Sequence, residues 1–117
     1  MKRTDATATP YGPASSRFPT LFSPIDLGPA RSRNRIMRVA TTSNLAERNR
    51  ARKRMRAFYR RVAEGGAGVV VSEAVRLHPA DSVVPSAIPL FDRGVIPGMR
   101  RISRAIHDAG ALFVVQL

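Results

Sequence analysis

Residues 67–74 read AGVVVSEA, a run of valines between a glycine and a polar pair. Adjacent apolar residues in so short a run are typical of a strand buried on both faces, as in a parallel sheet. Residues 111–117, ALFVVQL, repeat this pattern. The sequence therefore predicts two buried strands, and the segments around them decide the fold.

A first helix is predicted upstream of AGVVVSEA. Asn44, with Glu47 three residues later, has the spacing of a capping box at a helix start. Apolar residues then recur on one helical face: Met55, Phe58, Tyr59 and Val62. Gly65 and Gly66 end the helix. Before it, Ile36 and Val39 favour a strand over residues 34–40.

A second helix is predicted over residues 96–109, after a loop rich in proline. Pro97 lies in its first turn, and Gly110 follows its last residue. Its apolar stripe consists of Ile96, Met99, Ile102, Ile106 and Ala109. The complete order is strand, helix, strand, helix, strand, which places the chain in the α/β class.

Two consecutive βαβ units give a parallel sheet with right-handed crossovers and helices outside it. A TIM (β/α)8 barrel contains eight such strands in roughly 250 residues. This chain has 117 residues. We therefore expect the N-terminal part of a TIM barrel, about three βα units over residues 21–117, truncated after the third strand. Residues 1–20, rich in Pro, Ser, Thr and Ala, predict a disordered N-terminal arm.

Composition excludes several kinds of site. The chain has no cysteine, so disulfides, thiolate metal ligands and a cysteine nucleophile are excluded, and a cytoplasmic location fits. Two lone histidines, His78 and His107, do not make a zinc site, and we predict no metal. No apolar run approaches the ~20 residues that a membrane span needs.

The formal net charge of +12 raises nucleic acid as a partner. Arginines crowd the predicted helix between residues 48 and 61. A small basic nucleic-acid-binding protein that uses this helix is one alternative function, although no nucleic-acid fold signature is present. A non-functional truncated gene product is another, because a sheet that stops at ALFVVQL leaves an edge and apolar side chains uncovered.

Four segments resemble one known family in order and spacing: LFSPIDLG, RNRI, FYRRVAEGGAGVVVSEA and VIPGMRRISRAIHDAGALFVVQL. The chain is similar to the N-terminal part of the NADH:flavin oxidoreductases of the old yellow enzyme family. ATTSNLAE, the His78-Pro79 loop and VIPGMRR look most like the branch of 2,4-dienoyl-CoA reductases and trimethylamine dehydrogenase.

The resemblance implies a barrel that carries FMN at the C-terminal ends of its strands. It implies hydride transfer between NAD(P)H, the flavin and a small organic substrate, either an activated alkene or an amine. The implied cofactor-binding residues lie at the ends of the predicted strands: Ala40, Thr41, Thr42, Ala74 and Gln116. In the long branch a 4Fe-4S cluster and FAD occur, in regions beyond this sequence.

Gln116 matches the family glutamine that hydrogen-bonds the flavin pyrimidine edge; its alternative is a strand-end residue that faces water. Ala74 matches a small residue against the flavin ring, and Glu73 is expected to pair within the barrel. Many members carry Pro or His between Val39 and Asn44, and this sequence carries neither. The resemblance implies that the active-site acid and base residues lie in regions beyond this sequence, so we expect the chain alone neither to hold FMN tightly nor to turn over.

Overall fold

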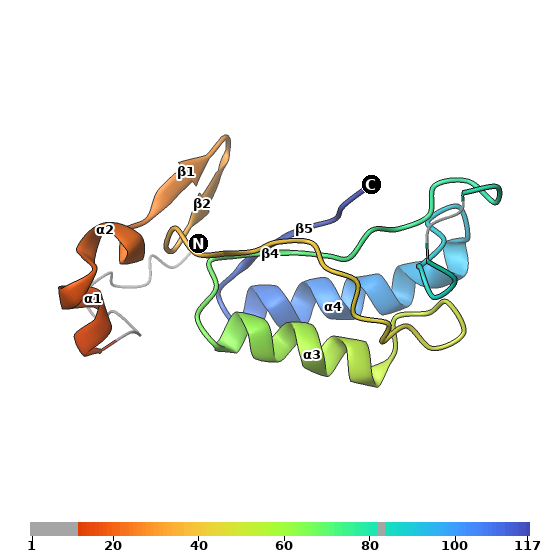
Figure 1. The fold of residues 1–117 in the computed structure, drawn as a ribbon, viewed down its shortest axis with the longest axis horizontal. Coiled ribbons are helices and arrows are strands. Elements are labelled where there is room, and N and C mark those ends of the chain that lie inside the picture. Colours follow the sequence, from red (N-terminus) through yellow and green to blue (C-terminus); the bar gives the residue numbers. More distant parts are fainter. Residues whose placement is uncertain (1–11, 82–83) are drawn as a thin grey trace.

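The computed structural model describes residues 12–81 and 84–117 (Figure 1). Its centre is a parallel sheet with the order β3 (Met37–Arg38), β4 (Val69–Val71) and β5 (Leu112–Val114). Helix α3 (Lys53–Glu64) connects β3 to β4, and helix α4 (Ile96–Asp108) connects β4 to β5. The predicted strand, helix, strand, helix, strand order and the parallel pairing are both confirmed.

Both helices cover the same face of the sheet (Figure 1). The core between sheet and helices contains Met55, Tyr59, Val70, Ile102 and Ile106, each at most 1% exposed. The predicted apolar stripes therefore face the sheet, with one exception. Ile96, the first residue of α4, is 47% exposed.

The opposite face of the sheet is open. Met37, Val39 and Val114 are 49%, 63% and 45% exposed. The prediction that β5 is buried on both faces is therefore wrong within this chain, since Phe113 and Val115 pack against the core while Val114, on the other face, is exposed. The open face is the side that would line the interior of a closed barrel.

Helix α3 begins at Lys53, so the predicted start at Asn44 is wrong. Asn44, Arg48 and Asn49 have φ values of 55°, 51° and 56°, which are left-handed and interrupt a helix. The Asn44 side-chain oxygen instead accepts from the Ser86 hydroxyl at 2.9 Å, and the Asn49 amide donates to the Ala87 carbonyl at 3.0 Å. A bond to a distant loop thus replaces the local capping box.

The strand predicted over residues 34–40 is also shorter than expected. Asn34 is fully buried, and its Oδ1 accepts from the backbone nitrogen of Ile36 at 3.0 Å. Side-chain bonds occupy this segment before the ladder begins, so only Met37 and Arg38 pair with β4.

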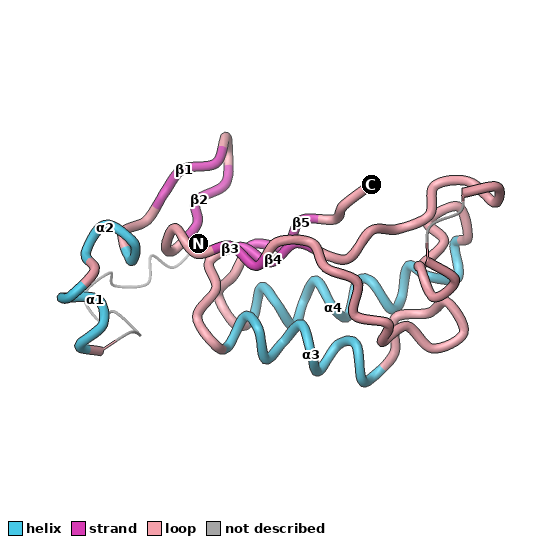
Figure 2. The backbone as a smooth tube through the Cα atoms, viewed as in Figure 1, coloured by secondary structure: helices cyan, strands magenta, loops and turns pink. Residues whose placement is uncertain are grey.

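Two short helices, α1 (Pro13–Arg17) and α2 (Pro19–Phe22), lie beside an antiparallel hairpin of β1 (Ile25–Leu27) and β2 (Ala30–Ser32) (Figure 2). Gly28 forms the hairpin turn with φ of 59°. Neither helix contains a buried residue. Residues 1–11 of the predicted arm lie outside the described residues, and the disorder of the arm stays a prediction. No helix in the described ranges is long and apolar enough to cross a membrane.

Candidate functional site

All five predicted site residues follow strands of the central sheet. Residues 40–42 follow β3, Ala74 follows β4 and Gln116 follows β5. Because the three strands are parallel, these positions lie at one edge, which we call the C-terminal edge. Ala40 and Ala74 are half-buried, whereas Thr41, Thr42 and Gln116 are exposed.

Hydrogen bonds beyond β4 and β5 hold two of these segments side by side. The backbone nitrogen of Gln116 donates to Ser72 Oγ at 3.1 Å, and that of Val75 donates to the Gln116 carbonyl at 3.2 Å. Ala74 lies between Ser72 and Val75 in the chain. The structure therefore brings the segments of Ala74 and Gln116 together.

Glu73 joins the segment after β3 to the segment after β4. Its carboxylate is buried and accepts from the hydroxyl of Ser43 at 2.9 Å and from the Ser43 backbone nitrogen. The Glu73 backbone nitrogen donates to the Tyr59 hydroxyl at 2.9 Å, and burial raises the pKa of Tyr59. Glu73 thus pairs structurally, as predicted. Ser43 was missed, because no local pattern marks a partner 30 residues away.

Arg38 fixes the backbone that leads to Thr41, and sequence reasoning missed it too. Its guanidinium donates to the carbonyls of Val71 at 2.7 Å and Thr41 at 3.1 Å. The same group lies 5.3 Å from the ring centres of Phe58 and Tyr59, a cation–π distance. The available signal was a charged residue between the apolar Met37 and Val39 of a strand.

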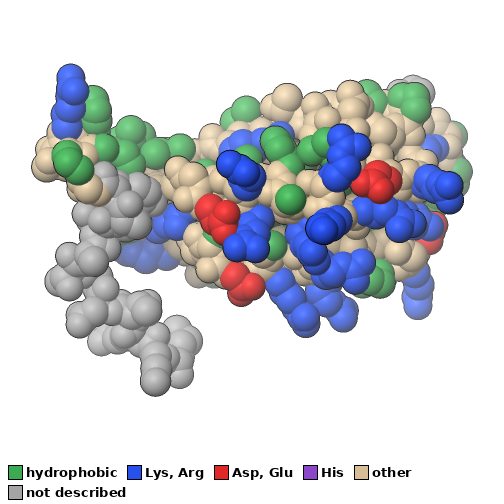
Figure 3. Space-filling view, turned by 90° about the horizontal axis from the view of Figure 1, so that it is seen from below, with side chains coloured by type: hydrophobic (Ala, Val, Ile, Leu, Met, Phe, Trp, Pro, Cys, Tyr) green, Lys and Arg blue, Asp and Glu red, His purple; other side chains and the backbone are tan. Residues whose placement is uncertain are grey.

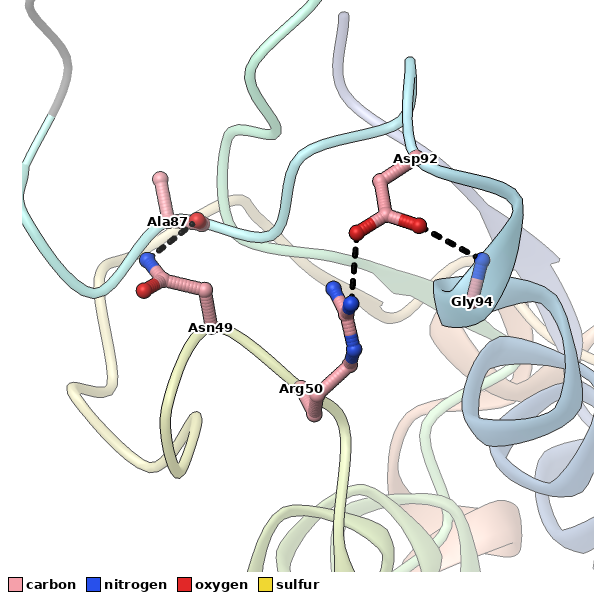
Figure 4. Close-up of polar contacts among 5 residues, drawn as sticks. All are labelled: Asn49, Arg50, Ala87, Asp92 and Gly94. Carbon is pink, nitrogen blue, oxygen red and sulfur yellow. Dashed lines mark hydrogen bonds and ion pairs between the residues drawn. The ribbon is translucent and has the colours of Figure 1, made fainter.

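The two loops that follow β3 and β4 are joined at their rim (Figure 4). Arg50 Nη2 lies 2.5 Å from Asp92 Oδ2, and Asp92 Oδ1 accepts from the Gly94 nitrogen at 2.7 Å. That second bond caps the short helix η1 (Arg93–Val95). The hydrogen bond from the Gly94 N–H is the main cause that lowers the pKa of Asp92, and the Arg50 guanidinium lowers it further. These contacts hold the outer rim of the edge together.

The edge also presents polar groups that the described chain leaves unpaired. Within residues 12–81 and 84–117, the hydroxyls of Thr41 and Thr42 and the amide of Gln116 make no hydrogen bond. In those ranges, no three His, Cys, Asp or Glu side chains are placed to hold a metal. The C-terminal edge therefore presents hydrogen-bonding groups that are available to a ligand.

The sequence model of the NADH:flavin oxidoreductase / NADH oxidase family matches residues 20–117. Similar curated proteins include a 4,4'-dithiodibutanoate disulfide reductase of Rhodococcus erythropolis, 32% identical over 85% of this chain and 24% of its own length. An NADH oxidase of Thermoanaerobacter brockii is 31% identical over 87% of this chain and 16% of its own length. The chain thus spans a quarter or less of these two relatives.

Solved structures agree with this assignment. The old yellow enzyme homologue of Zymomonas mobilis has a TM-score of 0.73 and 30% identity, over 85% of this chain and 28% of its own. Morphinone reductase has a TM-score of 0.77 at 22% identity, which shows the fold alone. The architecture is that of the first strands and helices of a TIM barrel. The chain belongs to the NADH:flavin oxidoreductase / NADH oxidase family.

Proposed function

We propose that this chain forms part of the FMN site of an NAD(P)H-dependent flavin oxidoreductase. The observation that carries the proposal is the C-terminal edge, where three chain segments distant in sequence are joined by hydrogen bonds. The cofactor-contacting residues in this proposal are those that the family resemblance implied: Ala40, Thr41, Thr42, Ala74 and Gln116.

The residues at this edge fit the chemistry of a flavin. Ala40 and Ala74 are small and half-buried, so they leave room for a flat ring to approach the strand ends. The Gln116 amide offers a donor and an acceptor, which suits a pyrimidine edge that carries both. Its lack of a partner among the described residues leaves both groups available.

FMN, when bound, supplies hydride transfer between a nicotinamide and the substrate. The protein residues proposed here bind and orient. Gln116 hydrogen-bonds the polar edge of the ring, and residues 40–42 contribute backbone groups and hydroxyls. Arg38 and Glu73 hold those segments in position through Thr41 and Ser43.

The substrate class is proposed as a small organic molecule, either an activated alkene or an amine. The 6-hydroxypseudooxynicotine amine oxidase of Pseudomonas geniculata, which has 29% identity and a TM-score of 0.73, supports the amine class. A cytoplasmic location is proposed because the cysteine-free sequence suits a reducing compartment.

The test uses the protein purified from the cells that make it, with its mass and its bound flavin measured. Gln116→Ala is expected to weaken FMN binding about tenfold, the equivalent of one or two hydrogen bonds. Thr20→Ala, an exposed position outside the C-terminal edge, is the matched control and is expected to change nothing. Equal FMN affinity in both variants would overturn the role of Gln116.

The 117-residue chain expressed by itself provides a second measurement. It is expected neither to bind FMN tightly nor to catalyse reduction, because it spans only 15–32% of the solved relatives. Submicromolar FMN affinity of this isolated chain would contradict that expectation.

A further inference from the structure

The outer surface of α3 and α4 carries a basic groove on the side away from the sheet. The two helices run side by side, and hollows of about 480 and 230 Å³ follow the line between them. Arg56 and Arg101 line both hollows, so the two form one groove. We call this the α3–α4 groove; its cations are Arg52, Lys53, Arg56, Arg60, Arg101 and Arg104.

Most of this positive charge has no partner. Arg60 is paired with Glu64 at 2.6 Å. The other five side chains form no ion pair or hydrogen bond with any described residue. Asp108 is the remaining carboxylate that lines the groove. Figure 3 shows Lys and Arg gathered over this face of the molecule.

The positive charges of the groove repel one another, and a bound anion would relieve this repulsion. Arg52, which immediately precedes α3, and Arg56 and Arg60 on α3 follow one another at i, i+4, and like charges at this spacing repel. Both helices begin at the same end of the groove, where their dipoles add positive potential, while Glu64 and Asp108 lie toward the opposite end. An anion is therefore attracted most strongly at the end where α3 and α4 begin.

The cations of the α3–α4 groove are spaced along its length. Arginines at i, i+4 rise about 6 Å along a helix, so Arg52, Arg56 and Arg60 span roughly 12 Å. A single small anion neutralises one or two of these groups, whereas an extended polyanion can contact most of them. The partner that fits is a polymer with regularly spaced negative charges.

The residues that line the groove favour a nucleic acid over an acidic protein as its partner. Between the cations lie small groups such as Ala51, Gly98 and Ala105, and no aromatic residue lines the groove among the described residues. Protein interfaces are usually centred on aromatic or other large apolar anchors, and base stacking also needs aromatic rings. The groove offers neither, but it offers guanidinium groups suited to phosphate.

We propose that the α3–α4 groove binds the phosphodiester backbone of nucleic acid without reading its sequence. This surface lies on the opposite side of the helices from the open face of the sheet and is independent of the proposed flavin site. The earlier nucleic-acid hypothesis used the arginines of one helix; the structure adds Arg101 and Arg104 of α4, which make the second wall.

The test measures binding of labelled 20-base-pair DNA and single-stranded RNA by fluorescence anisotropy between 50 and 300 mM salt. Contacts to Z phosphates give a slope of log K against log salt of about −0.9Z for duplex and −0.7Z for single strands. With five unpaired cations in the groove, slopes of about −4.5 and −3.5 are expected.

The double variant Arg56→Gln/Arg101→Gln removes the two residues that line both hollows. It is expected to weaken binding at least tenfold at 100 mM salt and to reduce the slope by about two. Arg54→Gln/Arg61→Gln is the matched control, because both residues are exposed on α3, line neither hollow and change the net charge equally. Arg56→Lys/Arg101→Lys, which keeps the charge, is expected to retain the slope.

Equal weakening by the groove and control variants would overturn the proposal, since binding would then reflect net charge alone. Absence of salt-dependent binding to both oligonucleotides would overturn it as well. Tighter binding of a poly-glutamate peptide of equal charge would assign the groove to an acidic protein partner instead. Circular dichroism of each variant ensures that a loss is read only from folded protein.

Discussion

The two ends of the strands in the central sheet, the edge where the strands begin and the C-terminal edge, carry their polar groups in opposite ways. At the edge where the strands begin, Ser32 and Asn34 are buried and hydrogen-bonded, and the half-buried Arg33 binds three backbone carbonyls. Arg33 donates to the carbonyls of Ala63 at 2.6 Å, Ala67 at 2.9 Å and Ala109 at 2.8 Å. At the C-terminal edge, Thr41, Thr42 and Gln116 are exposed and their side chains make no hydrogen bond within the described ranges.

This difference indicates that the edge where the strands begin contributes to stability and that the C-terminal edge serves binding. Arg33 places a positive charge where α3 and α4 end, and it ties both helix ends to the start of the sheet. Polar groups left available at the other edge add little to folding but can receive a ligand. Barrel enzymes divide their two faces in this way. Four substitutions test the division, ordered from the largest expected effect on stability to the smallest.

Replacing Arg33 is expected to cause the largest loss. Arg33→Ala leaves three carbonyls without a charged donor, and we expect the free energy of unfolding to fall by about 3 kcal/mol. Urea unfolding followed by circular dichroism measures it. The control is Arg31→Ala, whose exposed pair with Asp26 at 2.8 Å should contribute no more than about 0.5 kcal/mol. Equal effects of the two variants would contradict the role given to Arg33.

Gly68→Ala is expected to cost about 2 kcal/mol, because the segment before β4 passes close to buried polar groups. A Cβ at this position would lie 2.4 Å from both Asn34 Oδ1 and Ser32 Oγ. Gly65→Ala is the matched control, since its nearest neighbour would be the Arg61 carbonyl at 3.2 Å. Thermal unfolding compares the two, and an equal shift in both would argue against tight packing at Gly68.

Tyr59→Phe is expected to cost about 1 kcal/mol, since the buried backbone nitrogen of Glu73 loses its acceptor. The folded-state pKa of Tyr59 is raised above the ordinary value of 10.0, chiefly by burial. Its contribution to stability is therefore complete below about pH 10 and is lost as pH rises toward the folded-state pKa.

Unfolding titrations between pH 8 and 11 measure this contribution. The unmodified protein should lose stability more steeply above about pH 10 than Tyr59→Phe does. Identical slopes in the two proteins would show that the Tyr59 phenol ionises as readily in the folded state as in the unfolded state.

Gln116→Ala is expected to change the free energy of unfolding by less than about 0.5 kcal/mol, because the side chain is exposed and makes no hydrogen bond among the described residues. Differential scanning calorimetry in the absence of flavin measures this. A loss above about 1 kcal/mol would mean that the Gln116 side chain supports the fold, and the contrast between the edges would disappear at this position.

Much of the fold follows from local pattern. The valines of β4 and the helical stripe through Ile102 and Ile106 predict their elements, because burial of a periodic apolar face selects one secondary structure. Helix α4 was predicted over residues 96–109 and is observed over Ile96–Asp108. The parallel order then follows from the alternation of strands and helices.

The sequence by itself also placed all five candidate residues at the ends of strands, where the sheet brings them to one edge. Only the tertiary structure decided where α3 begins, since the side chain of Asn44, the predicted cap, accepts from Ser86, 42 residues away, and α3 starts at Lys53. It also decided the roles of Arg33, Arg38 and Ser43. Their partners are carbonyls and carboxylates from distant segments, and such bonds leave no periodic trace in a sequence because only folding brings the groups together.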